Sequence, residues 1–248
     1  MKKILILISL IGFVAQANAG QGQLTTYQIA GNDYKGYYTS PSKSSPLVIL
    51  IHDWDGMTAY EIKRADMLAD LGYSVFALDL FGKGVRPVEI ADKKKLTGQL
   101  YKDRPKMRML MNGALEHARK LGADTTRAVV AGYCFGGAAS LEWARSGADF
   151  KGFAIFHGGL TTPEGQDYSK TQGEILVLHG SVDKVAPMET FAQLAVELET
   201  AGVSHEMVAY SNAPHAFTVF GSKRYRETAD KKSWKRFVSF LSQTLKTQ

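Results

Sequence analysis

The sequence predicts an α/β fold in which a mostly parallel, doubly wound sheet carries helices on both faces. Short, continuous apolar segments alternate along the chain with segments whose apolar residues recur every three or four positions. That alternation is typical of buried parallel strands separated by amphipathic helices. The chain has 248 residues, 45% of them hydrophobic, which is enough for one large core, and no Pro-, Gly- or Ser-rich linker divides it. We therefore expect residues 20–248 to form one domain.

Eight segments have the composition of strands. The first two are short and are joined by a turn at residues 30–33, and most of the others are continuous apolar runs that suit strands buried on both faces. In chain order the predicted strands are Thr25–Ile29, Tyr34–Thr39, Pro46–Ile51, Tyr73–Leu80, Arg127–Ala131, Gly152–Phe156, Ile175–Leu178 and Glu206–Tyr210.

Five segments have the periodicity of amphipathic helices. Thr58 and Glu61 form a capping box that begins the first helix, and Gly72 ends it. The other predicted helices cover residues 107–121, 135–144, 187–201 and 234–245. Residues 82–103 are rich in Lys, Asp and Gly and interrupt the periodicity, so we interpret them as an excursion over the surface. The lysine run at residues 93–95 is expected to be a solvated face.

The composition excludes several classes of protein. The formal net charge is +6, from 30 basic and 24 acidic residues. No motif that reads a nucleic-acid groove accompanies this charge, so no nucleic-acid partner is expected. Cys134 is the only cysteine, which excludes a disulfide within the chain and a zinc site built from several thiolates. No later apolar run approaches the roughly 20 residues that span a bilayer, so no stable membrane insertion is expected.

The first residues have the pattern of a secretory signal. Lys2 and Lys3 precede an apolar run at residues 4–14, and Ala17-Asn18-Ala19 supplies the small residues that signal peptidase recognises. We expect cleavage after Ala19 and export to a bacterial periplasm or beyond; an uncleaved anchor is the alternative. The mature chain then carries a lone thiol into an oxidising compartment, where an unpaired cysteine needs a functional reason.

That cysteine follows a buried strand in a glycine-rich turn. The strand ending at Ala131 runs into residues 132–137 (GYCFGG), and a helix starts at once. Ligands of doubly wound sheets bind beyond the carboxyl ends of the strands. A nucleophile flanked by glycines at such a turn is a nucleophile elbow, with Cys134 in the place of serine. The helix dipole at this position favours the thiolate. The alternative for a lone cysteine is a small buried hydrophobic residue.

A base and an acid follow the last two strands. His215, within NAPHAF, comes after the final strand, and Asp183, within HGSVDKVAP, comes after the strand before it. The order nucleophile, acid, histidine is that of hydrolases built on this kind of sheet. Taken singly, His215 could be a loop histidine and Asp183 a helix cap. Three such residues in this order, each beyond its own strand, favour a catalytic triad.

The segment after the first buried strand (HDWDG) is the usual place for part of an oxyanion hole. We expect the hole to be formed by the backbone N–H groups of Trp54 and Phe135. Turn and capping chemistry is the alternative role for His52 and Asp53. A metal site made from these two residues and Asp55 lacks a second cluster to complete it. No metal is therefore expected.

These motifs resemble the dienelactone hydrolase family of α/β-hydrolases. The resemblance rests on GYCFGG around Cys134, on the Asp183 loop and on residues 214–217 (PHAF), and it extends over about residues 25–245. It implies an α/β-hydrolase fold and a Cys134–His215–Asp183 triad that hydrolyses lactones or esters without a cofactor. It also implies that an acid at the position of Asp53 holds or releases the proton of the cysteine; the best-known member has glutamate there.

The chain departs from this family in its basic residues. Members that act on dienelactone bind the substrate's carboxylate with arginines, one of them shortly after the catalytic histidine. Here no arginine follows His215, and Lys83 stands near the other position. Lysine cannot give the bidentate clamp of arginine, so dienelactone fits poorly as the substrate. Lys83 and His157 remain candidates for substrate binding, with a structural role as the alternative for His157 and for His179.

We therefore predict an exported hydrolase that cleaves a small ester or lactone through an acyl-thioenzyme. Cys134 attacks, His215 carries the proton and Asp183 orients His215. The segments at residues 82–106 and 158–172 are expected to shape the pocket. Two other functions stay open: a binding protein that keeps the fold without turnover, and a redox-responsive protein that pairs Cys134 with a partner's thiol. The sequence leaves the oligomeric state undetermined.

Overall fold

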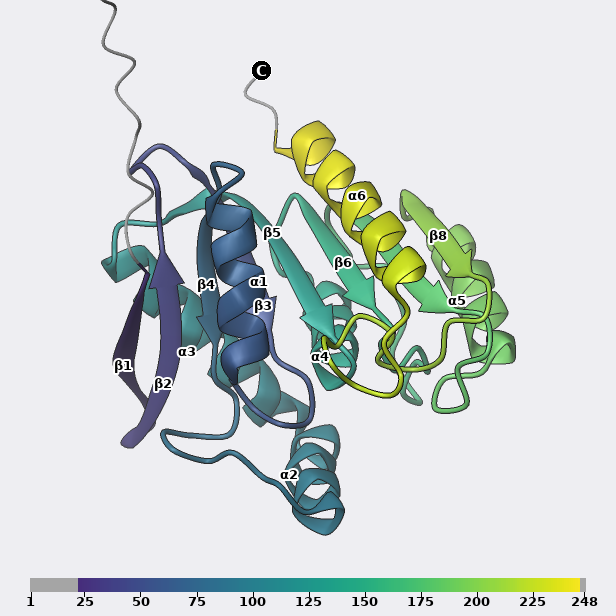
Figure 1. Ribbon diagram of the computed structural model, residues 1–248, viewed down its shortest axis with the longest axis horizontal. Coiled ribbons are helices and arrows are strands. Elements are labelled where there is room, and N and C mark those ends of the chain that lie inside the picture. The colour runs from purple at the N-terminus through teal and green to yellow at the C-terminus, as the bar shows by residue number, and fades with distance from the viewer. Residues whose placement is uncertain (1–21, 246–248) are drawn as a thin grey trace, which may run out of the picture.

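The structure, a computed structural model, describes residues 22–245; the predicted signal peptide lies outside them. Within this range the strands form one sheet in the order β1-β2-β4-β3-β5-β6-β7-β8 (Figure 1). The strands are β1 Gln23–Ile29, β2 Asn32–Thr39, β3 Pro46–Ile51, β4 Ser74–Leu78, β5 Asp124–Tyr133, β6 Gly152–Phe156, β7 Glu174–Gly180 and β8 His205–Tyr210. Strand β2 runs antiparallel to β1 and β4, and all the pairs from β4 to β8 are parallel. The predicted mostly parallel sheet is confirmed.

Helices cover both faces of this sheet, as predicted. The described helices are α1 Ala59–Ala69, α2 Ile90–Lys102, α3 Arg104–Lys120, α4 Phe135–Arg145, α5 Met188–Thr200 and α6 Glu227–Thr244. In Figure 1, α1 and α6 lie on one face and α3, α4 and α5 on the other. Successive strand residues point to opposite faces. In β3, Leu47 and Ile49 therefore join the core under α3 to α5, and Val48 and Leu50 join the core under α1 and α6.

The local signals explain where several elements begin and end. The predicted capping box is present at the start of α1: the carboxylate of Glu61 accepts hydrogen bonds from the backbone N–H and the hydroxyl of Thr58, at 2.8 and 2.7 Å. The turn between β1 and β2 is shorter than predicted. Only Ala30 and Gly31 separate the strands, both in the left-handed region at φ 49° and 78°, which is the conformation of a two-residue hairpin turn.

Residues 82–103 run over the surface, as predicted, but they also contain a helix that was not among the predicted ones, α2 at Ile90–Lys102. Only Thr97 and Leu100 of this helix are buried, so its apolar stripe is too narrow to show as periodicity. No side chain caps its first turn, which removes the other signal. Lys93 of α2 forms an ion pair with Asp55 and therefore ties the helix to the loop after β3.

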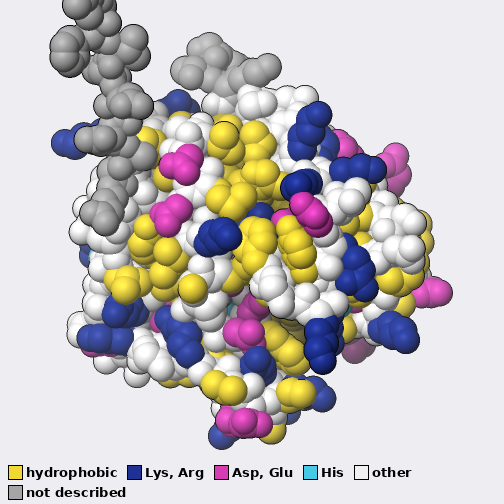
Figure 2. Space-filling model, in the orientation of Figure 1, with side chains coloured by type: hydrophobic (Ala, Val, Ile, Leu, Met, Phe, Trp, Pro, Cys, Tyr) yellow, Lys and Arg dark blue, Asp and Glu magenta, His cyan; other side chains and the backbone are white. Residues whose placement is uncertain are grey.

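The surface carries its charges in a dispersed way. On the face seen in Figure 2, Lys and Arg side chains are scattered among acidic and neutral ones rather than gathered into one block. No helix within residues 22–245 has both the length and the apolar character to cross a bilayer.

Candidate active site

Cys134 lies in a strained turn between β5 and α4. Its backbone has φ 53° and ψ −112°, a region that non-glycine residues rarely occupy, and its N–H donates to the carbonyl of Phe156 at 3.0 Å. A Cβ on Gly132 would lie 2.1 Å from the carbonyl oxygen of Gly136, and a Cβ on Gly136 would lie 2.2 Å from that of Ile51. Gly132 is therefore required for β5 to approach the start of α4, and Gly136 for α4 to approach the end of β3, which is the close packing of a nucleophile elbow.

The structure brings the three predicted triad side chains together. His215 Nε2 lies 3.0 Å from Cys134 Sγ, and His215 Nδ1 lies 2.8 Å from Asp183 Oδ2. The other oxygen of Asp183 accepts the backbone N–H groups of Val185 and Ala186, at 2.8 and 3.0 Å. An ionised carboxylate only accepts, so the hydrogen of His215 is assigned to Nδ1. The lone pair on Nε2 then faces the thiol.

The charge state of Asp183 follows from these contacts. Burial opposes its ionisation, but the hydrogen bond and charge of His215, together with the two amide hydrogen bonds, hold the pKa of its carboxyl below the ordinary value. His179 closes the same loop, since its Nε2 lies 2.8 Å from the carbonyl oxygen of Ala186. Asp183 is therefore held as a carboxylate in one orientation.

The thiol of Cys134 is not a ready-made thiolate, which corrects the expectation drawn from its place at a helix N-terminus. Burial raises its pKa to about 12, and the negative charge of Asp53 adds to this effect. Hydrogen bonds from the backbone N–H groups of Phe135 and Trp54 act in the opposite direction but do not outweigh the loss of water. At neutral pH the thiol keeps its proton, and His215 is placed to remove it.

The two N–H groups predicted to form the oxyanion hole both reach the sulfur. Because they approach Sγ, they also lie within reach of an oxygen on a carbon bonded to it. His52 braces this loop: its Nε2 accepts the N–H of Leu80 at 3.0 Å, so Nδ1 carries the hydrogen and donates to the carbonyl of Asp53 at 2.6 Å. Both ring nitrogens of His52 are thus engaged. No group of three potential metal-ligating side chains occurs within residues 22–245.

Asp53 lies close enough to Cys134 to act on it electrostatically. Its side chain is almost fully buried, and one oxygen accepts the N–H of Asp55 at 2.7 Å. Burial raises the pKa of Asp53 to about 6. It is therefore ionised at neutral pH, and its charge opposes formation of a second negative charge on the sulfur.

The structure does not place Lys83 or His157 where its side chain would bind a substrate beside Cys134. Lys83 is half exposed and pairs with Asp33 in the β1–β2 hairpin at 3.4 Å, because its backbone N–H is hydrogen-bonded to the same residue. His157 is fully buried, with its ring centroid 5.3 Å from that of His215. Because the ring of His157 has no solvent exposure, it contacts His215 and not a ligand.

A cavity of about 290 Å³ lies one helical turn from Cys134. It is lined by Tyr101, Arg104, Ala138, Arg145, Gly159, Thr161 and Pro163. Ala138 follows Cys134 by four residues on α4, and the ring of Tyr101 packs against Phe135 with centroids 5.4 Å apart. These residues come from α4 and from the two segments predicted to shape the pocket. Tyr101 was missed as a site residue because α2 was missed.

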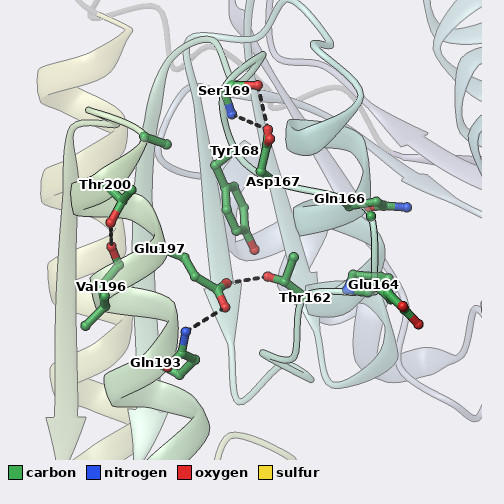
Figure 3. Close-up of a pocket in the computed structure, with 13 residues that line it drawn as sticks. Thr162, Glu164, Gln166, Asp167, Tyr168, Ser169, Gln193, Val196, Glu197 and Thr200 are labelled. Carbon is green, nitrogen blue, oxygen red and sulfur yellow. Dashed lines mark hydrogen bonds between the residues drawn. The ribbon is translucent and has the colours of Figure 1, made fainter.

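A second cavity, of about 490 Å³, lies between residues 162–169 and α5 (Figure 3). Glu197 crosses this space, accepting hydrogen bonds from Thr162 and from Gln193. None of the three triad residues lines it. The larger cavity is therefore separate from Cys134, Asp183 and His215.

Comparison with known proteins agrees with the geometry. Residues 34–245 match the Dienelactone hydrolase family. A protein of Salmonella typhimurium named "Putative carboxymethylenebutenolidase" is 26% identical, over 89% of this chain and 86% of its own length. A solved structure called m3DLH superposes with a TM-score of 0.85 at 26% identity, covering 91% of this chain and 99% of that one. A dienelactone hydrolase-like promiscuous phosphotriesterase from metagenomic libraries gives 0.84 at 28% identity, covering 92% and 100%.

Proposed function

Since this chain belongs to the dienelactone hydrolase family and is an ester or lactone hydrolase, we propose that it cleaves a small ester or lactone through a thioester on Cys134. The observation that supports this most directly is the unbroken contact from Sγ to His215 to Asp183, at 3.0 and 2.8 Å, in front of two converging N–H groups. A thiol, a base and an orienting acid are the parts that nucleophilic acyl transfer needs.

In the acylation step the thiol attacks the carbonyl carbon of the ester while its proton moves to His215 Nε2. The carbonyl oxygen becomes an oxyanion, which the N–H groups of Trp54 and Phe135 stabilise. When the oxyanion collapses, the C–O bond to the alcohol breaks and His215 returns its proton to the leaving oxygen. Asp183 stabilises the imidazolium between these transfers. A lactone gives the same thioester with its alcohol still attached to the acyl chain.

Deacylation uses the same groups in reverse. Water gives a proton to His215 as it attacks the thioester carbon, and the sulfur leaves with that proton while the free acid departs. No cofactor is needed for either half. The 290 Å³ cavity beside Cys134 is placed to receive the part of the substrate that does not react, and its size favours small esters.

We also propose that the protein is exported, and that its thiol is suited to an oxidising compartment. Thiolates are the form that oxidants attack, and the raised pKa of Cys134 keeps the resting enzyme protonated. Mass spectrometry of the protein from a periplasmic fraction is expected to give a chain that starts at Gly20. Recovery of the full-length chain from membranes alone would contradict export.

The hydrolase proposal is tested with the mature protein, Cys134→Ala and His215→Ala on a panel of activated esters and lactones, with intact-mass detection of an acyl adduct. A phosphotriester belongs in the panel because one of the similar structures is a promiscuous phosphotriesterase. Turnover lost in both variants, with an adduct on the parent, is the expected result. Ligand binding without an adduct would favour a binding protein, and a mixed disulfide recovered from cells would favour a redox-responsive one.

A further inference from the structure

We propose that His157, Thr218 and Tyr60 form a buried relay that positions His215. The three side chains are linked by hydrogen bonds, none of them belongs to the triad, and the mechanism above does not use them. The inference rests on the proposed function, because it assigns these residues to the base of that reaction. They are positioning residues, since they act on the ring of His215 and not on the substrate.

The rings of His157 and His215 are in direct contact. The ring of His157 meets that of His215 edge to face, with centroids 5.3 Å apart and planes at 65°. It also packs edge to face on Phe217, with centroids 5.4 Å apart. The backbone N–H of His157 donates to the carbonyl of Leu178 at 2.9 Å, in the strand that leads to Asp183. His157 therefore lies between the segments that supply the base and the acid.

The backbone at this point is held in an unfavourable conformation. His157 has φ 39° and Ala216, next to the base, has φ 61°, and both lie in the left-handed region that costs on the order of 1 kcal/mol or more outside glycine. Such conformations persist where surrounding contacts fix them. The side-chain hydrogen bond between His157 and Thr218 helps to fix this segment, together with the backbone hydrogen bonds from His157 to Leu178 and from Val219 to Ala216.

A chain of hydrogen bonds leads away from His157. Its Nε2 lies 2.8 Å from the hydroxyl of Thr218, which lies 2.7 Å from the hydroxyl of Tyr60. Arg64 Nε donates to that tyrosine at 3.3 Å, and Arg64 Nη2 donates to the carbonyl of Thr218 at 2.9 Å. The guanidinium also forms a buried ion pair with Asp230. Thr218, three residues after the base, is therefore held through its side chain and its backbone.

The donors of this chain can be assigned from Arg64, because a guanidinium only donates. If Tyr60 accepts from Arg64, its own hydrogen goes to Thr218, and the hydrogen of Thr218 goes to His157 Nε2. In this direction His157 Nε2 accepts, so the ring is neutral and carries its hydrogen on Nδ1, an atom that has no hydrogen-bond partner among the described residues. The ring places no positive charge beside a base that must itself become cationic.

The titratable groups around His157 support the neutral form. His215 packs against it, Tyr133 lies with its ring centroid 5.9 Å away, and His179 and Arg64 act on it electrostatically. Burial lowers the pKa of His157 well below the ordinary value, and the charge of His215 lowers it further. Protonation of His215 during the reaction therefore leaves the relay unchanged.

The test compares variants that remove one hydroxyl each. Thr218→Val removes the hydroxyl at constant shape and is expected to lower kcat about tenfold or more, with KM changed less than about twofold, because misplacement of a catalytic group costs rate rather than binding. Thr218→Ser restores the hydroxyl and is expected to return kcat to within about threefold of the parent. Tyr60→Phe is expected to give a smaller decrease in kcat.

Tyr37→Phe is the matched control. It also removes a buried tyrosine hydroxyl, bonded to Asp66 at 2.6 Å, but it has no link to His215. Both tyrosine variants are expected to lose thermal stability, and only Tyr60→Phe is expected to change kcat. The pH dependence of Cys134 alkylation by iodoacetamide supplies a second readout, since it reports how well His215 supports the thiolate. A merely structural role would lower Tm and leave this profile unchanged.

Failure of the relay and failure of the proposed function are distinguishable. A parent enzyme that forms the acyl adduct and turns over, together with a Thr218→Val variant of unchanged kcat and alkylation profile, would overturn the relay alone. A Thr218→Ser variant as impaired as Thr218→Val would also overturn it. A parent without adduct or turnover would refute the hydrolase mechanism. In that case the ¹⁵N signals of His157 and His215 still test the relay, since Thr218→Val is expected to shift both.

Discussion

Replacing Asp53 with asparagine removes a negative charge that opposes ionisation of Cys134, and we expect it to make the thiol more reactive. Asparagine has the shape of aspartate and keeps an oxygen that can accept the N–H of Asp55, the hydrogen bond that orients this side chain at 2.7 Å. The change therefore isolates charge from geometry. Burial is the larger cause of the raised pKa of Cys134, and Asp53 is the next.

The size of the effect follows from the electrostatics. At an effective dielectric constant of about 20, two unit charges interact by on the order of 4 kcal/mol at about 4 Å and 2 kcal/mol at about 8 Å. A difference of one in pKa corresponds to about 1.4 kcal/mol and a tenfold change in thiolate. The pKa of Cys134, about 12 in the parent, is therefore expected to fall by about one to two in Asp53→Asn. Alkylation at pH 8 is expected to become about 10- to 100-fold faster.

The most specific prediction concerns the pH dependence of the rate of Cys134 alkylation. The pKa of Asp53 is about 6, so the parent carries the charge above that pH and loses it below. The ratio of alkylation rates, variant to parent, is expected to approach one near pH 5 and to rise from about pH 6 to a plateau above about pH 8, because the thiolate and the carboxylate raise each other's pKa by the same amount. Iodoacetamide labelling followed by intact mass measures both rates.

Asp55→Asn is the matched control. Asp55 is two residues away, but it is paired with Lys93 and its side chain is partly exposed, so its removal is expected to change the rate less than about threefold. Equal rates for parent and Asp53→Asn at pH 8, or a slower variant, would show that Asp53 does not hold the proton of the thiol.

Three further predictions concern stability, each read from urea unfolding. Gly136→Ala places a Cβ 2.2 Å from a backbone carbonyl of β3, so the variant is expected to lose at least about 3 kcal/mol of unfolding free energy or to fail to fold. Gly98→Ala, with open space around it in α2, should gain up to about 1 kcal/mol. Equal effects of the two substitutions would refute the steric argument. Glu142→Gln leaves three arginines without their shared buried carboxylate, so it is expected to cost about 3–5 kcal/mol of unfolding free energy. The exposed Glu116→Gln is expected to cost less than about 1 kcal/mol. A loss of similar size for the two variants would contradict the role of the Glu142 carboxylate. Burial raises the pKa of Glu61 to about 8, so the folded state binds more protons than the unfolded state between about pH 4.5 and 8, and stability falls as the pH rises through that range. Glu61→Gln lacks this penalty, so its stability relative to the parent should increase by on the order of 4 kcal/mol between pH 5 and 9. A difference independent of pH would disprove the assignment.

Much of the architecture was predictable because its determinants are local. The alternation of apolar runs and amphipathic segments encodes which residues are buried and on how many faces, and this is enough to predict a parallel sheet covered on both sides. Cys134, Asp183 and His215 each follow a different strand. Parallel strands end at one edge of the sheet, so their convergence could also be anticipated. α2 escaped prediction because a helix that buries two residues leaves almost no pattern.

The properties of the site depend on contacts between residues that are far apart in the sequence. The place of Cys134 at a helix N-terminus argues for a thiolate, and burial together with Asp53 reverses that conclusion. Lys83 lies near the sequence position of a substrate-binding arginine in the family, but its side chain pairs with Asp33, 50 residues away. Thr218 meets a tyrosine 158 residues earlier. The sequence by itself determined the fold and the placing of Cys134, Asp183 and His215 after their strands, because burial pattern and turn chemistry depend on neighbouring residues. The protonation of the thiol and the support of the base were decided only by tertiary structure, because desolvation and electrostatic interaction depend on which distant residues pack around a group.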